Sequence, residues 1–279
     1  MDTRGGILRR VVIMFSFLLF VVAGIGVLGY RKFLTAPIFS GQVRVESGTV
    51  AVNGAHIIGS VALAQGDTIE TANGLATVFL HESVIIALAP NTKIVVTDLN
   101  KKQPRVTQLS GKTWNEFTAL SGVQGYTITE HGHTATVHGT AFELSEGKMM
   151  TGEGTVAYDA NGKSFNVLSG QVAEVVNDAV VTRQASPDEQ TRIQDNIRAS
   201  IAELRYLRDQ EMTKYPIIVE QIKNQFHVTD AQIQSGFLSA DMGQIDIDAL
   251  AAKIPFHIAA ADRIVEITKA IQQLQHAVK

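Results

Sequence analysis

The sequence predicts a mainly β protein, a solenoid-like roll or a sandwich, with a C-terminal helical region and one N-terminal transmembrane helix. Three observations predict this arrangement. An uncharged apolar run fills residues 11–30, and short apolar-alternating segments separated by Gly, Asn and Asp fill residues 40–184. Apolar residues at helical spacing then follow in residues 186–279.

The composition limits the classes of function that the protein can have. The chain has 279 residues and a formal net charge of −3, so it lacks the basic character typical of nucleic-acid binding proteins. It contains no cysteine, which excludes disulfides, thiolate metal sites and cysteine nucleophiles. We therefore expect no nucleic-acid partner.

The N-terminal segment predicts a membrane anchor. The run Val11–Tyr30 carries no charge, and about twenty residues at ~1.5 Å each span roughly the 30 Å hydrocarbon layer. A cleaved signal peptide is the alternative, but its apolar region usually has about 7–15 residues. The best small-residue cleavage site here, Ala36, is followed directly by Pro37. We expect residues 1–10 in the cytoplasm, residues 31–39 as a linker, and the rest of the chain outside.

The region from residue 40 to residue 184 is typical of strands joined by short turns. Segments such as "QVRVESGTVAV" and "TIETANGLATVFL" alternate apolar and polar residues, as half-buried strands do. A weak internal repeat, which we call the internal echo, consists of an apolar residue, then polar or small residues, then a glycine. It recurs at uneven spacing. This echo fits strands that turn back repeatedly, and it occurs at Gly48, Gly66, Gly111 and Gly170.

The C-terminal region changes to a helical pattern. Ser186 is expected to be an N-cap, with Pro187 at the first helical position and Glu189 completing a capping box. Pro216 is expected to end or kink this helix. A second helix is predicted after it, and a short third one is predicted to begin near Thr229.

The last helix carries an apolar seam. Ile264, Ile267, Ile271 and Leu274 follow one another at intervals of three and four residues, which is heptad spacing. Such a stripe usually packs on neighbouring helices of the same chain, and we expect that here. The alternative is a seam that contacts a partner protein or a second copy.

The histidines do not predict a metal site. His131 and His133 share one face of a strand, whereas His138 points to the other face. A solvated strand face explains this pattern better than metal binding, because no third ligand of matching parity is near. The chain also lacks a G-x-S-x-G nucleophile elbow. We expect no enzymatic activity, no metal and no cofactor.

Two further features are interpreted as structural. Asp241, Asp246 and Asp248 do not fit the spacing of a calcium loop, so we expect them to be solvated and to cap a helix start. Trp114 is expected to anchor a small core or an interdomain contact. Glu116, on the same strand face as Trp114, indicates that this face is partly exposed.

The β region resembles the FecR-like domain, which is named for an iron-citrate transport regulator of bacterial envelopes. The resemblance covers about half of the chain, through "GDTIETANGLA" and "APNT" in the first half and "GTAF" and "SGQV" in the second. The matching residues are Gly66, Asp67, Ile69, Thr71, Gly74, Ala76, Pro90, Asn91, Thr92, Gly139, Thr140, Phe142, Gly170 and Gln171.

The resemblance implies that several of these residues shape turns. Gly66 and Asp67 form a tight turn, in which the Asp67 carboxylate accepts backbone hydrogen bonds. Asn73 and Gly74 form the next turn, with positive φ at Gly74 as in a hairpin. The remaining turn residues are Gly139, which admits a close strand approach, Thr140, and Gly170 in the closing Gly-Gln turn.

The sequence also departs from the family's signalling members. Those members resemble anti-sigma regulators with a sizeable cytoplasmic domain before the membrane span, whereas only about ten residues precede Val11. They also end in a domain that meets an outer-membrane transporter, whereas this chain ends in helices. The resemblance therefore does not carry over a sigma-regulator role.

The function predicted from these features is that of a binding or scaffold protein outside the cytoplasm. It would be held by a single span in the inner membrane of a bacterial envelope, and its partner would be an envelope protein or another copy. A transmembrane signal transducer is the alternative, and an envelope enzyme is a third possibility.

Overall fold

The structure is a computed structural model, and the predicted anchor lies outside the part that it describes. Within the described residues, no helix combines the length and the apolarity needed to cross a bilayer. Val11–Tyr30 and the linker are not among these residues, so the membrane anchor stays a prediction. The described residues are 40–120, 122–177, 179–214, 216, 219–220, 223–224, 229–248 and 259–278.

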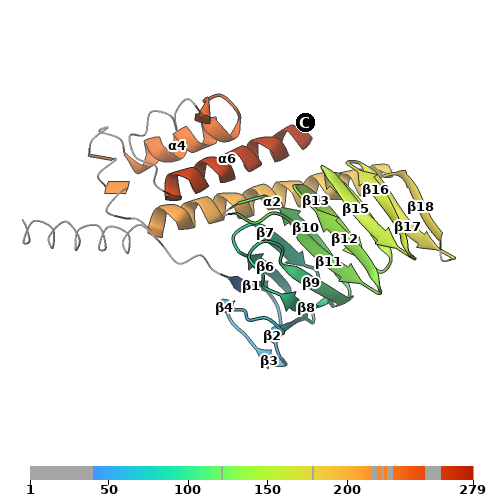
Figure 1. Cartoon of the computed structure of the whole chain (residues 1–279). Helices are drawn as coiled ribbons and strands as arrows, with labels where there is room; N and C mark the ends of the chain where they lie inside the picture. Colours follow the sequence, from blue (N-terminus) through green and yellow to red (C-terminus); the bar gives the residue numbers. More distant parts are fainter. Residues whose placement is uncertain are drawn as a thin grey trace, which may run out of the picture.

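The strands of the described chain form two nine-stranded sheets (Figure 1). The helix-side sheet consists, in spatial order, of β18 (Ala179–Gln184), β17 (Gln171–Val176), β14 (Lys148–Glu153), β13 (Thr140–Ser145), β10 (Lys112–Phe117), β7 (Val84–Leu88), β6 (Leu75–Leu80), β1 (Gly41–Ser47) and β4 (Ser60–Ala62). The open sheet consists of β16 (Lys163–Leu168), β15 (Thr155–Ala160), β12 (His133–Val137), β11 (Tyr126–Glu130), β9 (Arg105–Ser110), β8 (Lys93–Asp98), β5 (Thr68–Thr71), β2 (Val50–Val52) and β3 (Ala55–His56).

The chain crosses repeatedly between the two sheets as it advances. Both sheets therefore hold their strands in nearly the order of the sequence. The β6–β7, β13–β14 and β17–β18 hairpins lie in the helix-side sheet, and the β8–β9, β11–β12 and β15–β16 hairpins lie in the open sheet. The predicted mainly β class with C-terminal helices is confirmed, with the β part built as two layers.

The burial pattern of each strand shows whether one face or both faces of its sheet are covered. The open sheet has one face on the core and one in solvent, so β8 and β11 alternate between buried and partly exposed residues. In the helix-side sheet, β7, β10 and β13 are buried on nearly every residue, because helices cover the second face. The largest fully buried side chains of the core between the sheets are Phe117, Tyr126, Phe142 and Tyr158.

Glycines allow close backbone contact between neighbouring crossings, which are the segments that connect one sheet to the other. A Cβ on Gly48 would lie 2.6 Å from the Cα of Gly74, and a Cβ on Gly74 would lie 2.6 Å from the carbonyl oxygen of Thr49. Gly111 and Gly154 make equally close approaches to the crossings beside them. The internal echo at Gly48 and Gly111 therefore marks places where backbone packs directly on backbone.

The structure corrects two expectations about glycines. Gly74 is not among the residues with positive φ, because Asn73 and Gly74 do not close a hairpin. They join β5 of the open sheet to β6 of the helix-side sheet, so Gly74 is needed for space and not for its dihedral angle. At Gly139 an added Cβ would meet no atom within 4 Å, and the close approach there belongs to Gly154 of the next crossing.

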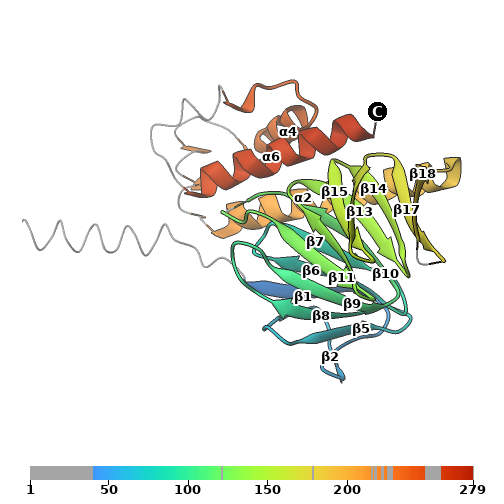
Figure 2. The same cartoon turned by 45° about the vertical axis from the view of Figure 1, so that its right-hand side comes forward.

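A long helix crosses the outer face of the helix-side sheet (Figures 1 and 2). This helix, α2 (Pro187–Lys214), begins over β17 and β18 and ends beside the β6–β7 turn. Its 28 residues measure about 42 Å, similar to the roughly 38 Å across nine strands. The predicted capping box forms, since the Ser186 N–H donates to Glu189 Oε2 at 2.8 Å and the Glu189 N–H donates to Ser186 Oγ at 3.4 Å.

Two further helices pack beside α2. The shorter helix is α4 (Asp230–Asp241), and the C-terminal helix is α6 (Ala259–Ala277). Thr229 is the N-cap of α4 and forms a capping box with Gln232. Both helices pack along α2 (Figure 1), and α6 also contacts β14 of the helix-side sheet.

The helices and the outer face of the helix-side sheet share a second apolar core. Within it, the α6 side chains Ile267, Ile271 and Leu274 are at most 2% exposed, whereas Ile264 is partly exposed. The buried part of the seam therefore faces α2 of its own chain and is not available to a partner. The other large members of this core are Phe79, Ile85, Trp114, Leu120, Met150, Val172, Ile193, Ile197, Ile201, Leu204 and Leu207.

This shared core indicates that residues 40–184 need the helices to bury the outer face of the helix-side sheet. We predict that a fragment of residues 40–184 exposes the outer face of its sheet, including Phe79, Ile85 and Trp114, and loses cooperative unfolding. Binding of a hydrophobic dye and near-ultraviolet circular dichroism, compared with a fragment of residues 40–279, measure this. A fragment 40–184 that unfolds cooperatively without binding dye would contradict the prediction.

The contact between crossings generates a second prediction. Gly74→Ala should lower the free energy of unfolding by about 1–3 kcal/mol, because its Cβ would press on backbone atoms. Gly236→Ala in α4 is the matched control, since its Cβ would meet nothing within 4 Å. Alanine favours helix, so the control should be neutral or stabilising by up to about 1 kcal/mol. Denaturant unfolding measures both, and equal effects would refute the packing role of Gly74.

Candidate binding site beside the β6–β7 turn

The turn between β6 and β7 is strained and buried. His81 and Glu82 have φ of 50° and 60°, a left-handed conformation that costs non-glycine residues on the order of 1–3 kcal/mol. Each is only 6% exposed. His81 Nε2 lies 2.9 Å from the Leu99 carbonyl oxygen, and Ser83 Oγ donates to the Leu120 carbonyl oxygen at 2.8 Å. These contacts hold the polar turn inside the protein.

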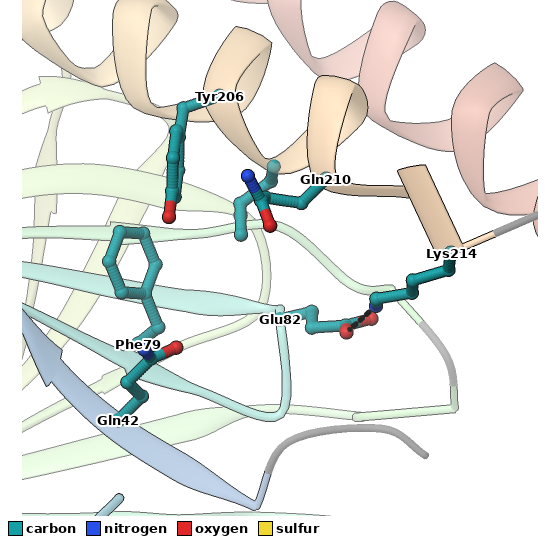
Figure 3. A pocket seen from close by; sticks show the side chains of 7 residues that line it. Gln42, Phe79, Glu82, Tyr206, Gln210 and Lys214 are labelled. Carbon is teal, nitrogen blue, oxygen red and sulfur yellow. Dashed lines mark hydrogen bonds and ion pairs between the residues drawn. The ribbon is translucent and has the colours of Figure 1, made fainter. Parts of the chain in front are cut away.

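A cavity of about 80 Å³ lies between this turn and α2 (Figure 3). Tyr206, Gln210 and Lys214 are four residues apart, so they follow one another along a single face of α2. The sheet supplies the opposite wall from β1, β6 and the turn. The lining residues are Gln42, Phe79, Glu82, Tyr206, Leu207, Gln210 and Lys214.

The carboxylate of Glu82 is only half satisfied. Its Oε1 accepts a hydrogen bond from Lys214 Nζ at 2.6 Å, as Figure 3 shows. Its buried Oε2 has no hydrogen-bond partner among the residues that the structure describes. Lys214 also pairs with Glu211, whose other oxygen accepts from Arg263 Nε at 2.9 Å. Charges of alternating sign thus connect the cavity to α6.

An aromatic and cationic stack closes the side of the cavity next to β1. The Arg44 guanidinium lies 4.4 Å from the ring centroid of Tyr206 and 5.3 Å from that of Phe79. Its Nη2 donates to both carboxylate oxygens of Glu203 at 2.7 and 2.8 Å. This charge-assisted pair and the cation–π contacts fix the position of α2 on β1.

A second ionic cluster holds the three helices together behind the cavity. Asp241 has no exposed side-chain surface and pairs with Arg205 at 2.8 Å and with Arg208 at 2.5 Å. Arg208 also donates to Thr268 Oγ1 of α6 at 3.2 Å and stacks 4.3 Å from the centroid of Phe237. The expectation that Asp241 is solvated and caps a helix start is wrong, because it lies buried at the C-terminal end of α4.

The face of β10 under the helices contains a buried acid. Glu116 is 3% exposed, so the expectation of an exposed face beside Trp114 is wrong. Trp114 Nε1 donates to Ser200 Oγ of α2 at 2.8 Å. Burial, and secondarily the charge of Glu153, raises the pKa of Glu116 well above its ordinary value. Its Oε2 has no hydrogen-bond partner in the described chain.

The residues predicted to shape turns lie away from this cavity. Asp67 Oδ2 accepts the N–H of Ala64 at 2.7 Å, and its Oδ1 accepts from Asn53 Nδ2 at 2.7 Å. Asn73 Oδ1 accepts the N–H of Thr49 at 3.2 Å. Asp67 therefore bonds to its own turn and to the β2–β3 turn beside it, and Asn73 bonds to the neighbouring connection between β1 and β2.

The remaining predicted turn residues also lie at crossings between the sheets. Gly66 and Gly170 have positive φ, and the Gly170 N–H donates to the Thr151 carbonyl oxygen at 2.8 Å. Gly139 also has positive φ, just before β13. Thr140 begins β13, and its buried Oγ1 has no hydrogen-bond partner within the described residues.

The histidines are dispersed. His131 lies in the exposed β11–β12 turn, and His133 Nδ1 lies 3.3 Å from the Tyr158 hydroxyl. His138 Nδ1 lies 2.9 Å from the Gln124 carbonyl oxygen. Among the described residues, no group of three or more His, Cys, Asp or Glu side chains is placed to hold a metal ion.

Sequence reasoning missed the cavity because its residues are far apart in the chain. The local signal was the triplet His81-Glu82-Ser83 between two apolar strands, where a hairpin turn normally takes Asn-Gly. Non-glycine residues in the left-handed conformation at such a turn cost free energy, and strain of this kind occurs frequently at functional sites.

The buried carboxyl of Glu116 generates a pH prediction. With its pKa raised, the folded protein keeps a proton that the unfolded chain releases above about pH 4.3. Its contribution to stability is thus complete below that pH and decreases as the pH rises. Glu116→Gln should raise the thermal midpoint at pH 8 and change it little at pH 4.

The exposed Glu70→Gln on β5 is the control for this prediction. It should show no such pH dependence in the same thermal unfolding series. A Glu116→Gln variant whose shift is the same at pH 4 and pH 8 would refute the buried neutral carboxyl.

Comparisons with known proteins give few relatives. No family model and no curated protein matches this chain. Two crystal structures, at 2.50 and 1.65 Å resolution, of "a putative anti-sigma factor" from Parabacteroides distasonis ATCC 8503 are similar, each with 13% sequence identity and a TM-score of 0.39. Each match covers 44% of this chain and 62% of that chain, so this chain spans less than two thirds of the length of the chains that it matches.

Proposed function

We propose that this protein is a membrane-anchored binding or scaffold protein of a bacterial cell envelope, with its β layers displayed outside the cytoplasm. The observation that carries the proposal is the cavity beside the β6–β7 turn. There a strained turn presents a buried carboxylate oxygen, on Glu82, that no described residue satisfies. Strain and an unsatisfied acceptor in one cavity are typical of a binding position.

The position of the cavity supports its role in an anchored protein. The N–H of His81 donates to the carbonyl oxygen of Ser40 at 3.2 Å, so the described chain begins directly beside the strained turn. A linker of about nine residues, 31–39, reaches at most roughly 30 Å when extended. A domain held by Val11–Tyr30 would therefore present the cavity close to the membrane surface.

The chemistry of the lining favours binding over catalysis. The seven lining residues include no serine, threonine, cysteine or histidine. They provide one carboxylate, one ammonium group, two amides, one phenol hydroxyl and apolar surface. Such a set orients a ligand through hydrogen bonds, but it lacks the paired nucleophile and base of covalent catalysis.

The assignment of residues 40–184 to the FecR-like family is part of this proposal. It is supported by the ordered motif residues from Gly66 to Thr92 and from Gly139 to Gln171. Gly66, Gly139 and Gly170 have the positive φ expected of turn glycines, which is consistent with the family pattern.

A transmembrane signal transducer is the second candidate, and the course of α2 favours it. One end of α2 is tied to the far edge of the sheet, where Glu189 pairs with Arg183 of β18 and Lys148 of β14. The other end is tied to the β6–β7 turn by Lys214 and Glu82. A single rigid helix thus connects one edge of the domain with the part nearest the proposed anchor.

Fractionation of the full-length protein tests the anchor. After carbonate washing, the chain should stay in the membrane fraction, because a span of about twenty apolar residues inserts stably. Protease added to the outer side of the inner membrane should digest residues beyond the linker. Recovery of a mature soluble chain that begins near Pro37 would refute the anchor.

Replacing the span distinguishes the two candidate functions. A chain in which Val11–Tyr30 is exchanged for an unrelated span of equal length should keep the partners of a scaffold protein in a cross-linking pull-down. Loss of those partners with the β layers still folded would favour a transducer whose span contacts another membrane protein.

A further inference from the structure

The buried oxygen of Glu82 requires a hydrogen-bond donor. The side chain lines the cavity, its residue is 6% exposed, and its Oε2 has no partner in the described chain. An unsatisfied buried acceptor costs about 1–3 kcal/mol, and more for a charged group. The complementary ligand therefore carries an O–H or N–H group.

The charges around the cavity favour a neutral donor. Lys214 Nζ lies 2.6 Å from the other oxygen of Glu82, so a cation bound at Oε2 would lie within roughly 5 Å of the ammonium group. Glu82, Lys214, Glu211 and Arg263 already alternate in sign. An added cation would be repelled by Lys214 without a free counter-charge.

The other polar groups favour a ligand that both donates and accepts. Gln42 and Gln210 line the cavity, and neither side chain makes a hydrogen bond within the described residues. In Figure 3, Gln210 reaches from α2 toward the sheet, and Gln42 lies on the opposite side below Phe79. Each amide offers donors and an acceptor, which are the groups that hydroxyls need.

The rest of the lining is aromatic and aliphatic, and the Tyr206 hydroxyl is its one further polar group (Figure 3). Phe79, Tyr206 and Leu207 provide ring and aliphatic surface against which the C–H groups of a ring can pack. A carboxylate, two amides and aromatic walls are complementary to a ring that has hydroxyl groups at its edge and C–H groups on its faces. The cavity of about 80 Å³ limits the buried part of the ligand to one ring or less.

We propose that this cavity binds the pyranose ring of a neutral sugar, with Glu82 as hydrogen-bond acceptor and Gln42 and Gln210 at the rim. The proposal deepens the binding role proposed above by naming a ligand class. Its test does not depend on the membrane anchor, so failure of either proposal is recognised separately.

The test compares three sugars with the same ring. Full-length protein in a detergent without a sugar headgroup is titrated at pH 6 with glucose, N-acetylglucosamine and glucosamine, and saturation-transfer NMR follows binding. At this pH glucosamine carries an ammonium group in place of a neutral substituent. The two neutral sugars should bind, and glucosamine should bind about tenfold more weakly because of Lys214.

Two variants test whether the sugar binds in the cavity. Glu82→Gln replaces the acceptor oxygen and should weaken neutral-sugar binding at least about tenfold. Gln210→Ala alters an exposed residue of α2, so the fold should persist while binding weakens several-fold. Glu70→Gln, on an exposed glutamate paired with Lys93 at 3.0 Å, is the matched control and should bind like the wild type.

Three results would overturn the proposal. Tighter binding of glucosamine than of N-acetylglucosamine would show a cation site. Binding that is unchanged in the folded Gln210→Ala variant and in Glu82→Gln would place the sugar elsewhere. No binding of either neutral sugar would show that the unsatisfied oxygen of Glu82 is structural only.

Discussion

The packing of α2 across the outer face of the helix-side sheet is the interaction on which the rest of the structure depends. Along the helix, Glu189 meets β14 and β18, Ser200 meets Trp114 of β10, and Glu203 meets Arg44 of β1. The same helix supports α4 through Asp241 and α6 through the second core. A sheet with an apolar outer face therefore has its cover in the same chain.

The sequence was sufficient for features that depend on neighbouring residues. Alternation predicted the strands, and Ser186, Pro187 and Glu189 predicted the start of α2, because capping is a contact across one helical turn. The seam at Ile267 and Ile271 was expected to pack within the chain, and it does. Periodicity is a local property, so it survives without knowledge of the tertiary structure.

Features that depend on the approach of distant segments were not predictable. Gly74 was expected to serve a hairpin, but its role is set by Thr49 and Gly48 of another crossing. Glu116 and Asp241 were expected in solvent, since charged residues usually are. Both are buried by helices far along the chain, and Glu82 joins a cavity only because Lys214 lies above it. No short window of sequence holds both members of these pairs.

The order of strands in both sheets has a consequence for how such a protein can change in length. Because each sheet grows at its end as the chain advances, inserting one more hairpin in each layer would extend the stack without rethreading it. The covering helix does not have this freedom. Each added strand widens the sheet by about 4.8 Å, which corresponds to roughly three residues of helix. A protein of this fold with more or fewer strands therefore needs an α2 helix that is longer or shorter in proportion. The length of the helix thus limits the number of strands that it can cover.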